Sequence, residues 1–348
     1  MSEHLEVGKI LIVWYKENAR DLPWRRTKNP YYIWLSEIML QQTRVEAVKP
    51  YFQRFIERCP TIEALANIDE EALLKLWEGL GYYSRVRNLQ KAAKTVMEHY
   101  GGVLPAEYEA LRGLAGIGPY TAGAIASIAF SLPYAAVDGN VLRVMSRLAA
   151  DSRDITLGAT KKAWEEEVVL MMPEGEEGSL TQALMELGAT VCLPNGVPNC
   201  AACPLRGHCK AYEKNTVMQF PVKSPKKERT KVSLSVFFLV DHNKIALQKR
   251  GKKGLLSGLW ELPNCSVEMA LPAALNEWGI LSADIRRMKA QKHIFTHVEW
   301  HMDCYFVEVK ENRNETFLWI DRQTAEKEYA LPSAFKKIWW EGCAGLEE

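Results

Sequence analysis

The sequence lacks long apolar runs, internal repeats, low-complexity tracts and any excess of charge of one sign. No stretch approaches the ~20 apolar residues of a transmembrane helix, so we expect no membrane partner. The opening MSEHLEVGKI has no apolar stretch of signal-peptide type, which indicates a cytoplasmic protein in a reducing compartment. The net charge of +1 predicts nothing about nucleic acid, although a local basic patch could still bind phosphates. A chain of 348 residues has room for about two domains.

Four of the eight cysteines fall in one short segment with the spacing Cys192-x7-Cys200-x2-Cys203-x5-Cys209. In a reducing compartment, clustered cysteines indicate a metal site or catalysis rather than disulfides. Zinc ribbons usually show two separated C-x2-C pairs, whereas this segment has one pair with two outlying partners. The wide, uneven spacing favours an iron–sulfur cluster, and zinc remains the alternative, with His208 able to replace one thiolate.

The chain divides at residues 214–231, KNTVMQFPVKSPKKERTK, which has the proline content and charge of a linker. Basic residues of its second half are either solvated or lie along a DNA backbone: Lys223, Lys226, Lys227, Arg229 and Lys231. The sequence before the linker is helical almost throughout. After it, apolar residues alternate from Val232 to Val240 and again at Ile245 and Leu247, which predicts strands. A helix at 268–278, a strand around 302–308 and a final helix from about 333 complete an α+β domain.

Residues 111–130, LRGLAGIGPYTAGAIASIAF, predict two helices joined by a tight turn. The first helix ends near Leu111, the turn follows at Gly116-Ile117-Gly118, and Pro119 suits the first position of the second helix. The glycines permit positive φ and leave the backbone N–H groups open to a ligand. Those N–H groups and the helix dipole would bind an anion such as a phosphate, although an ordinary helical hairpin needs no ligand.

Two acidic residues stand out as candidates for acid–base chemistry. Glu37 is surrounded by Trp34, Leu35, Ile38 and other apolar residues, and burial among them would raise its pKa towards that of a general acid. The alternative is an ordinary glutamate on the polar side of a helix. Asp138 precedes an amphipathic run, where its simplest role is that of a helix N-cap.

These motifs together resemble the endonuclease III superfamily of DNA glycosylases, and most closely its adenine-specific mismatch branch of the MutY type. The resemblance covers nearly the whole chain and includes LPWR (22–25), SEIMLQQT (36–43), GLGYYSR (79–85) and VDGNV around Asp138. It implies a mainly α catalytic region over 1–213, with a six-helix barrel at 22–132 and an iron–sulfur domain formed by 1–21 with 133–213. It also implies a Nudix-like α+β domain at 232–348, after the linker at 214–231.

The resemblance further implies a [4Fe-4S] cluster on Cys192, Cys200, Cys203 and Cys209. The family usually has six residues between the first two cysteines, and this chain has seven, LPNGVPN. Gly196 and the two prolines would let this loop bulge outward without moving the sulfur atoms.

By the same resemblance, Glu37 is the acid that protonates adenine N7 while the N-glycosidic bond breaks, and Asp138 stabilises the cationic sugar that remains. The adenine must leave the base stack, and Gln42 and Tyr82 match residues that fill the space in the duplex. Gly116 and Gly118 belong to the hairpin that grips phosphates through backbone amides. Further matches to active-site positions are Arg25, Asn140 and Gln182.

Position 120 separates two branches of the superfamily. Bifunctional relatives carry a lysine there, whose amine attacks the sugar and then cleaves the strand through a Schiff base. This chain has Tyr120, which cannot form an imine. The substitution predicts base removal without efficient strand cleavage.

The C-terminal half contains LQKRGKKGLLSGLWELPN (247–264), which resembles the opening of a Nudix hydrolase domain. Such hydrolases need an R-E-x-x-E-E run to hold magnesium, and Glu277 is its only echo here, so we expect no pyrophosphate hydrolysis. Phe295-Thr296-His297 resembles the F-S-H loop with which MutY-type enzymes recognise 8-oxoguanine. A strand end with incidental polar residues is the alternative.

The expected function is therefore that of a monofunctional glycosylase in base excision repair. Its partner would be duplex DNA with adenine opposite 8-oxoguanine or guanine, and we expect a monomer associated with the nucleoid of a bacterium. Two alternatives remain. The first is a bifunctional pyrimidine glycosylase/lyase, against which Tyr120 argues. The second is a non-catalytic DNA-damage binding protein with structural zinc, against which Glu37 and Asp138 argue.

Overall fold

A computed structural model describes residues 3–225 and 228–346; Lys226 and Lys227 of the basic segment lie outside this range. The described residues form two compact units. The first comprises the described parts of Met1–Asn67 and Arg87–Pro225, and the second comprises Ile68–Val86 with the described part of Lys226–Glu348. A short segment from the N-terminal half therefore belongs to the C-terminal unit. Along the described residues, no helix combines the length and apolar character that crossing a bilayer requires.

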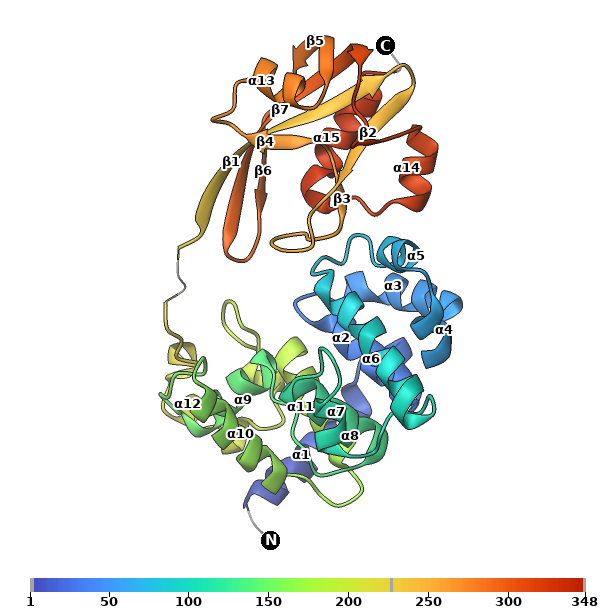
Figure 1. Ribbon diagram of the computed structural model, residues 1–348. Helices are drawn as coiled ribbons and strands as arrows, with labels where there is room; N and C mark the ends of the chain where they lie inside the picture. Colours follow the sequence, from blue (N-terminus) through green and yellow to red (C-terminus); the bar gives the residue numbers. More distant parts are fainter. Residues whose placement is uncertain (1–2, 226–227, 347–348) are drawn as a thin grey trace. The chain divides into compact units, whose positions relative to one another are not determined.

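The first unit is built from helices (Figure 1). Its α-helices are α1 (Glu3–Asn18), α2 (Pro30–Leu40), α3 (Val45–Arg58), α4 (Ile62–Asn67), α6 (Ser84–Tyr100, whose first residues lie in the second unit), α7 (Tyr108–Arg112), α8 (Pro119–Phe130), α9 (Gly139–Ala149), α10 (Gly158–Leu170), α11 (Glu177–Thr190) and α12 (Lys210–Glu213). Short 3₁₀ helices are η1 (Pro23–Arg25), η2 (Cys200–Ala202), η3 (Arg206–His208) and η4 (Val217–Gln219).

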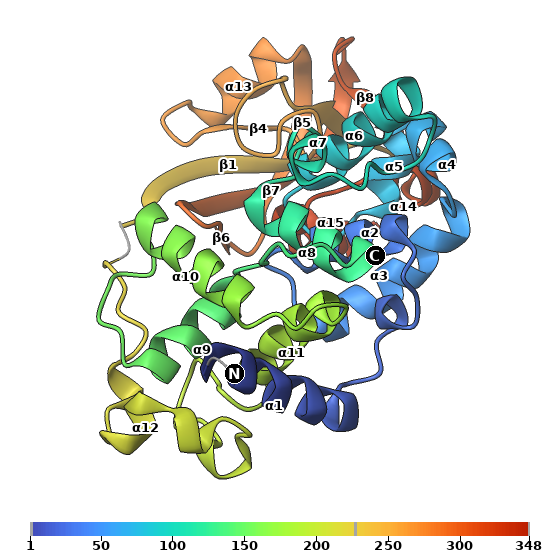
Figure 2. The same cartoon turned by 90° about the horizontal axis from the view of Figure 1, so that it is seen from below.

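Helix α11 is the centre of the first unit, because it packs on α1, α8 and α9 (Figure 2). Small residues permit this close packing. A Cβ atom added to Gly178 of α11 would lie 2.9 Å from the Ser127 carbonyl oxygen of α8, and one added to Gly188 would lie 2.6 Å from Cβ of Asn140. In α8, a Cβ on Gly123 would lie only 2.1 Å from the Ala135 oxygen. Larger residues at these positions would push apart the helices that carry the site described below.

The second unit is an eight-stranded sheet with helices on both faces. Its strands are β1 (Thr230–Asp241), β2 (Lys244–Lys249), β3 (Trp260–Glu261), β4 (Asn264–Ser266), β5 (Ile280–Arg287), β6 (Gln291–Ile294), β7 (Val298–Asn312) and β8 (Leu318–Ile320). The main strand order is β3-β2-β1-β7-β5, while β4 pairs with β1, β6 with β7 and β8 with β2. Its helices are α5 (Glu70–Leu76), α13 (Leu271–Glu277), α14 (Arg322–Glu328) and α15 (Ser333–Ala344).

Alternation along β1 separates the two cores of this unit. Phe238 faces a core that includes Phe335 and Trp339 of α15, whereas Phe237 faces one that includes Ala274 and Leu275 of α13. Strand β1 is parallel to β7 from Thr230 to Val240, which places both strands in the middle of the sheet. The alternation from Val232 to Val240 predicted β1 from the sequence, but it said nothing of the pairing with β7.

The predicted fold class is confirmed, with a helical N-terminal part and a mixed α+β C-terminal part. The helices predicted at 268–278 and from 333 correspond to α13 and α15, and the strand predicted at 302–308 lies within β7. The sequence reading missed β3, β4, β6 and β8, each of two to four residues, and the longer β5. Most residues of β5 are exposed, so no alternation of buried residues marked it.

Candidate active site

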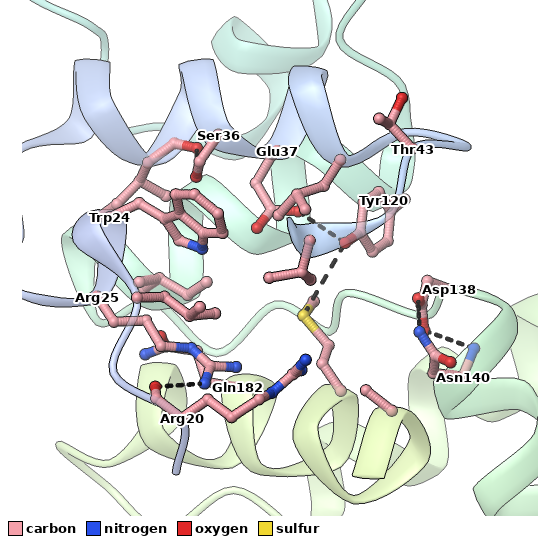
Figure 3. A pocket seen from close by; sticks show the side chains of 17 residues that line it. Arg20, Trp24, Arg25, Ser36, Glu37, Thr43, Tyr120, Asp138, Asn140 and Gln182 are labelled. Carbon is pink, nitrogen blue, oxygen red and sulfur yellow. Dashed lines mark hydrogen bonds between the residues drawn. The ribbon is translucent and has the colours of Figure 1, made fainter. Parts of the chain in front are cut away.

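Glu37 is a buried carboxyl group on the inner side of α2. It is 5% exposed, and the hydroxyl of Tyr120 donates a hydrogen bond to its Oε2 at 2.6 Å (Figure 3). Burial raises the pKa of Glu37 to about 7, and the negative charge of Asp138 adds to this rise. The hydrogen bond from Tyr120 and the charge of Arg25 lower it. The raised pKa expected from its apolar neighbours is confirmed, and near neutral pH the group can both hold and release a proton.

Tyr120 reaches Glu37 because of the turn that precedes α8. Pro119 starts the helix, as predicted, and Gly116 has φ of 77°, a conformation that favours glycine. Gly118 departs from the expectation, since its φ of −86° suits any residue. No heavy atom lies within 4 Å of a Cβ built on Gly118, which leaves the start of α8 open. Burial and Glu37 raise the pKa of Tyr120 well above its usual value, so its hydroxyl remains a hydrogen-bond donor.

Asp138 is the N-cap of α9, as its position before an amphipathic run predicted. Its Oδ1 accepts hydrogen bonds from the backbone N–H groups of Asn140 and Val141, both at 2.8 Å. Its Oδ2 accepts one from Nδ2 of Asn140 at 2.7 Å. Burial raises the pKa of Asp138, and these hydrogen bonds act in the opposite direction because they stabilise the carboxylate.

One cavity of about 160 Å³ brings these groups together. Six of the candidate residues line it: Arg25, Glu37, Tyr120, Asp138, Asn140 and Gln182. Glu37 and Tyr120 lie on one side of the cavity, while Asp138 and Asn140 lie at the start of α9 (Figure 3). Two carboxyl groups, one with its pKa near neutrality and one held by backbone N–H groups, therefore line the same cavity.

A buried ion-pair network at the edge of this cavity was missed from the sequence. Glu186 in α11 is fully buried, and its carboxylate accepts hydrogen bonds from Nε of Arg20 at 2.7 Å and from Nη2 of Arg25 at 2.8 Å. Burial alone would raise the pKa of Glu186, but the two arginines hold it at about 2. The only signal in the sequence was an acidic residue on the apolar face of α11, between Leu184 and Leu187.

A chain of hydrogen bonds leads from Asp138 towards the cysteine-rich segment. Asn140, which donates to Asp138, accepts a hydrogen bond from Nη2 of Arg143 at 3.0 Å. Nε of Arg143 donates to the Cys192 carbonyl oxygen at 2.8 Å, and Nη1 of Arg147 lies 3.3 Å from Cys192 Sγ. These two buried arginines on the apolar face of α9 were also missed, although charges in such a stripe require partners.

The four cysteines of the predicted cluster are free thiols within the first unit. Among the residues that the structure describes, no group of three or more His, Cys, Asp or Glu side chains is arranged to hold a metal ion. The donor set nevertheless fits a thiolate-bound group. Burial raises the pKa of Cys203 to about 11, the N–H of Leu205 acts in the opposite direction, and the other three thiols add to the rise, so the four side chains interact electrostatically.

The loop between Cys192 and Cys200 carries the extra residue. Residues 194–197 are exposed, and Val197 is 83% exposed. Gly196 has φ of 72° and meets no heavy atom within 4 Å of a Cβ built on it. The loop therefore projects into solvent, as expected from its glycine and prolines.

The remaining candidates lie outside this cavity. Gln42 is exposed with φ of 58° and belongs to the first unit, as do Gly116 and Gly118. Tyr82 belongs to the second unit together with Phe295, Thr296 and His297.

Within the second unit, the oxygen of Tyr82 lies 2.8 Å from Oγ1 of Thr296. Phe295 packs edge-on against Trp300, with ring centroids 4.9 Å apart, and so anchors the loop in the core. Arg229 donates from Nε to the Phe295 carbonyl oxygen at 3.1 Å. Tyr82 and Thr296, far apart in sequence, thus form one exposed group, while Phe295 packs against the core.

Comparison with known proteins places this architecture in a recognised class. Residues 35–169 match the family described as HhH-GPD superfamily base excision DNA repair protein, and residues 235–341 match the NUDIX domain. The solved structure of a thermostable thymine-DNA glycosylase is 28% identical, covers 61% of this chain and 97% of its own, and superposes with a TM-score of 0.55. The helical unit is thus that of the helix-hairpin-helix base excision glycosylases.

Relatives that match most of the chain identify the family within this class of glycosylases. Adenine DNA glycosylase of Rattus norvegicus is 34% identical over 85% of this chain and 69% of its own length. Adenine DNA glycosylase of Buchnera aphidicola subsp. Baizongia pistaciae is 32% identical over 94% of both chains. The chain belongs to the adenine DNA glycosylase family.

Proposed function

We propose that this protein removes adenine from mispairs with 8-oxoguanine or guanine in duplex DNA, by hydrolysis of the N-glycosidic bond and without cleaving the strand. The observation that carries the proposal is the cavity shared by Glu37, whose pKa is about 7, and Asp138. Residues 1–213 would form the catalytic region and 232–348 the recognition domain, and the protein would act as a monomer.

Glu37 would donate its proton to N7 of an adenine turned out of the duplex. Protonation makes adenine a better leaving group, so the bond from N9 to C1′ breaks with both electrons going to the base. The sugar becomes a cation, and the Asp138 carboxylate stabilises it electrostatically. Water then adds at C1′ and passes a proton to the Glu37 carboxylate, which restores the acid and leaves an abasic site. Gln182, Arg25 and Asn140 line the same cavity and would position base and sugar.

Tyr120 supports hydrolysis rather than strand cleavage. By the family resemblance it occupies the sequence position at which bifunctional relatives carry a lysine, and an oxygen cannot form a Schiff base. A duplex with one adenine opposite 8-oxoguanine, end-labelled and incubated with the protein, should show strand breaks only after hot alkali. Breaks without alkali would indicate a lyase, and no breaks under either condition, with binding retained, would indicate a damage-binding protein.

Substitution of Tyr120 by phenylalanine should change the pH dependence of adenine release. The variant removes the hydrogen bond that lowers the pKa of Glu37, so that pKa should rise further. Because the protonated acid is the active form, the decline in rate at alkaline pH should move to higher pH. Single-turnover rates measured from pH 5 to pH 9 test this, and an unshifted decline would exclude Tyr120 as a modulator of the acid.

The cysteine quartet would hold a [4Fe-4S] cluster through Cys192, Cys200, Cys203 and Cys209. Four cysteine thiolates are the usual ligands of such a cluster, and the hydrogen bond from Arg147 to Cys192 is of the kind that stabilises a thiolate. Protein purified without oxygen should be brown and contain iron and acid-labile sulfide. Zinc without sulfide would contradict the assignment.

Thr296 would contact 8-oxoguanine, since its hydroxyl is held at the exposed group with Tyr82. Substitution by alanine should reduce the preference for 8-oxoguanine over guanine by about fivefold, the value of one hydrogen bond worth about 1 kcal/mol. Thr296→Ser is the matched control, because it keeps the hydroxyl and should keep the preference. If Thr296→Ala and the wild type prefer 8-oxoguanine over guanine equally, this loop does not recognise 8-oxoguanine.

A further inference from the structure

The segment of residues 68–86, here called the Tyr82 arm, is fastened to the rest of the second unit by two glutamates. The first is Glu71 in α5. Its Oε1 lies 2.5 Å from Nζ of Lys249, and its Oε2 accepts a hydrogen bond from Nε1 of Trp260 at 3.0 Å. Lys249 in turn lies over the Trp260 ring, 5.4 Å from its centroid. One carboxylate thus binds two adjacent side chains of the strands β2 and β3.

The second of these glutamates is Glu78, which follows the C-terminal end of α5. Its Oε1 accepts a hydrogen bond from the backbone N–H of Leu331 at 3.1 Å and lies 3.4 Å from Nζ of Lys336. Lys75 pairs with Glu78 at 2.7 Å and also donates to the Tyr329 carbonyl oxygen at 3.0 Å. These contacts join the arm to the segment between α14 and α15.

A cavity lies beside these polar contacts. The cavity has a volume of about 280 Å³ and is lined by Lys75, Glu78, Trp260, Tyr329 and Lys336 among others. The hydrogen bonds and ion pairs beside this cavity add to the burial of apolar side chains of the arm such as Leu73, Leu74 and Trp77, and they fix its orientation. Partly buried carboxylates with charged donors make stronger hydrogen bonds than neutral pairs do.

Hydrogen bonds within the arm also fix the backbone between Glu78 and Tyr82. Nε1 of Trp77 donates to the Gly81 oxygen at 3.1 Å, and Nη2 of Arg85 donates to the Leu80 oxygen at 2.9 Å. The Arg85 guanidinium also lies 5.4 Å from the centre of the Tyr82 ring. Tyr82 itself has φ of 47°, an uncommon conformation that its surroundings must maintain. Movement of α5 would therefore move Tyr82.

We propose that Glu71 and Glu78 are positioning residues for lesion recognition: they hold the Tyr82 arm so that the Tyr82 hydroxyl stays beside Thr296. Neither glutamate touches DNA in this proposal, and each acts through Tyr82. The proposal rests on the proposed function, since it takes Tyr82 and Thr296 as the group that reads the base opposite adenine. In addition, the preference for 8-oxoguanine over guanine depends on Glu71 and Glu78, which do not contact that base.

The test is a comparison of DNA affinity with the rate of adenine release. The dissociation constants are measured on duplexes with uncleavable 2′-fluoro-2′-deoxyadenosine opposite 8-oxoguanine or guanine. Glu78→Gln and Glu71→Lys should each reduce the ratio of the two constants by about tenfold, the effect of losing one charged hydrogen bond. The rate of adenine release at saturating enzyme should change less than about twofold, because Glu37 and Asp138 lie in the first unit. A variant that unfolds would instead lose both DNA binding and adenine release.

A charge exchange and a matched control test whether the lost preference comes from the contacts of Glu71 and Glu78. Adding Lys249→Glu to Glu71→Lys restores an ion pair of opposite polarity and should recover several-fold of the lost preference. Glu315→Gln makes the same chemical change as Glu78→Gln at an exposed residue and should leave the preference unchanged. Unchanged preference in Glu78→Gln and Glu71→Lys, or no recovery on charge exchange, would overturn the proposal. Failure of the wild type to release adenine would instead overturn the proposed function.

Discussion

Replacing Glu37 with glutamine should reduce adenine release by about 10²- to 10⁴-fold and leave binding of the mispaired duplex intact. Glutamine has nearly the same shape and can still accept the Tyr120 hydrogen bond, but it has no proton to give to adenine N7. Single-turnover release of adenine and a binding titration measure the two effects separately. A variant that binds the duplex and releases adenine at more than a tenth of the wild-type rate would show that another group is the acid.

The pH dependence of the wild type should follow the titration of Glu37. Its pKa of about 7 means that the protonated acid is abundant below neutrality, so the rate should fall as the pH rises through about 7. A rate that does not change between pH 6 and pH 9 would contradict this expectation. The glutamine variant supplies the control, since its residual rate should not follow this titration.

The same titration affects stability. The native pKa of Glu37 lies above that of an unfolded glutamate, so the folded state binds more protons between the two values. Stability from this group is fully present below about pH 4.5 and is lost as the pH rises through about 7, a change of roughly 3 kcal/mol. The glutamine variant lacks this loss. Its free energy of unfolding, relative to the wild type, should therefore increase between pH 5 and pH 8.

The features predicted from the sequence were those with local causes. The raised pKa of Glu37 followed from apolar residues next to it in the chain, and the capping role of Asp138 followed from the amphipathic run after it. The start of α8 at Pro119 followed from the missing N–H group of proline. A helix and its ends depend on residues within a few positions, so sequence patterns describe them well.

The features that were missed depend on contacts between distant residues. Glu186 is bound by Arg20 and Arg25, more than 160 residues earlier in the chain. The inclusion of residues 68–86 in the second unit depends on partners such as Lys249 and Leu331. Spacing within one segment carries no information about such partners, because they are set by the packing of whole elements. The buried charge was visible in the sequence, but its counter-charges were not.

Replacing Asp138 with asparagine should reduce adenine release by about 10²- to 10³-fold, the usual effect of removing one electrostatic group from a developing charge. Asparagine caps helices about as well as aspartate, so α9 should still begin at Gly139. The variant therefore separates two roles that the wild-type residue combines. Loss of activity with an unchanged melting temperature would assign the effect to the charge near the sugar, whereas a parallel loss of stability would assign it to the cap.

The hydrogen bonds of Asn140 and Arg143 also limit how an asparagine can be oriented at position 138. Nδ2 of Asn140 donates to the aspartate, and Arg143 fixes Asn140 through its Oδ1, so the chain presents a donor to position 138. An asparagine that keeps the cap uses its only side-chain oxygen for the N–H groups of Asn140 and Val141, so its amide nitrogen meets the Asn140 donor and that hydrogen bond is lost. Replacing Asn140 with alanine removes the donor but keeps the charge, and its loss of activity should be the smaller of the two. If Asn140→Ala proves as inactive as Asp138→Asn, orientation of the carboxylate matters as much as its charge.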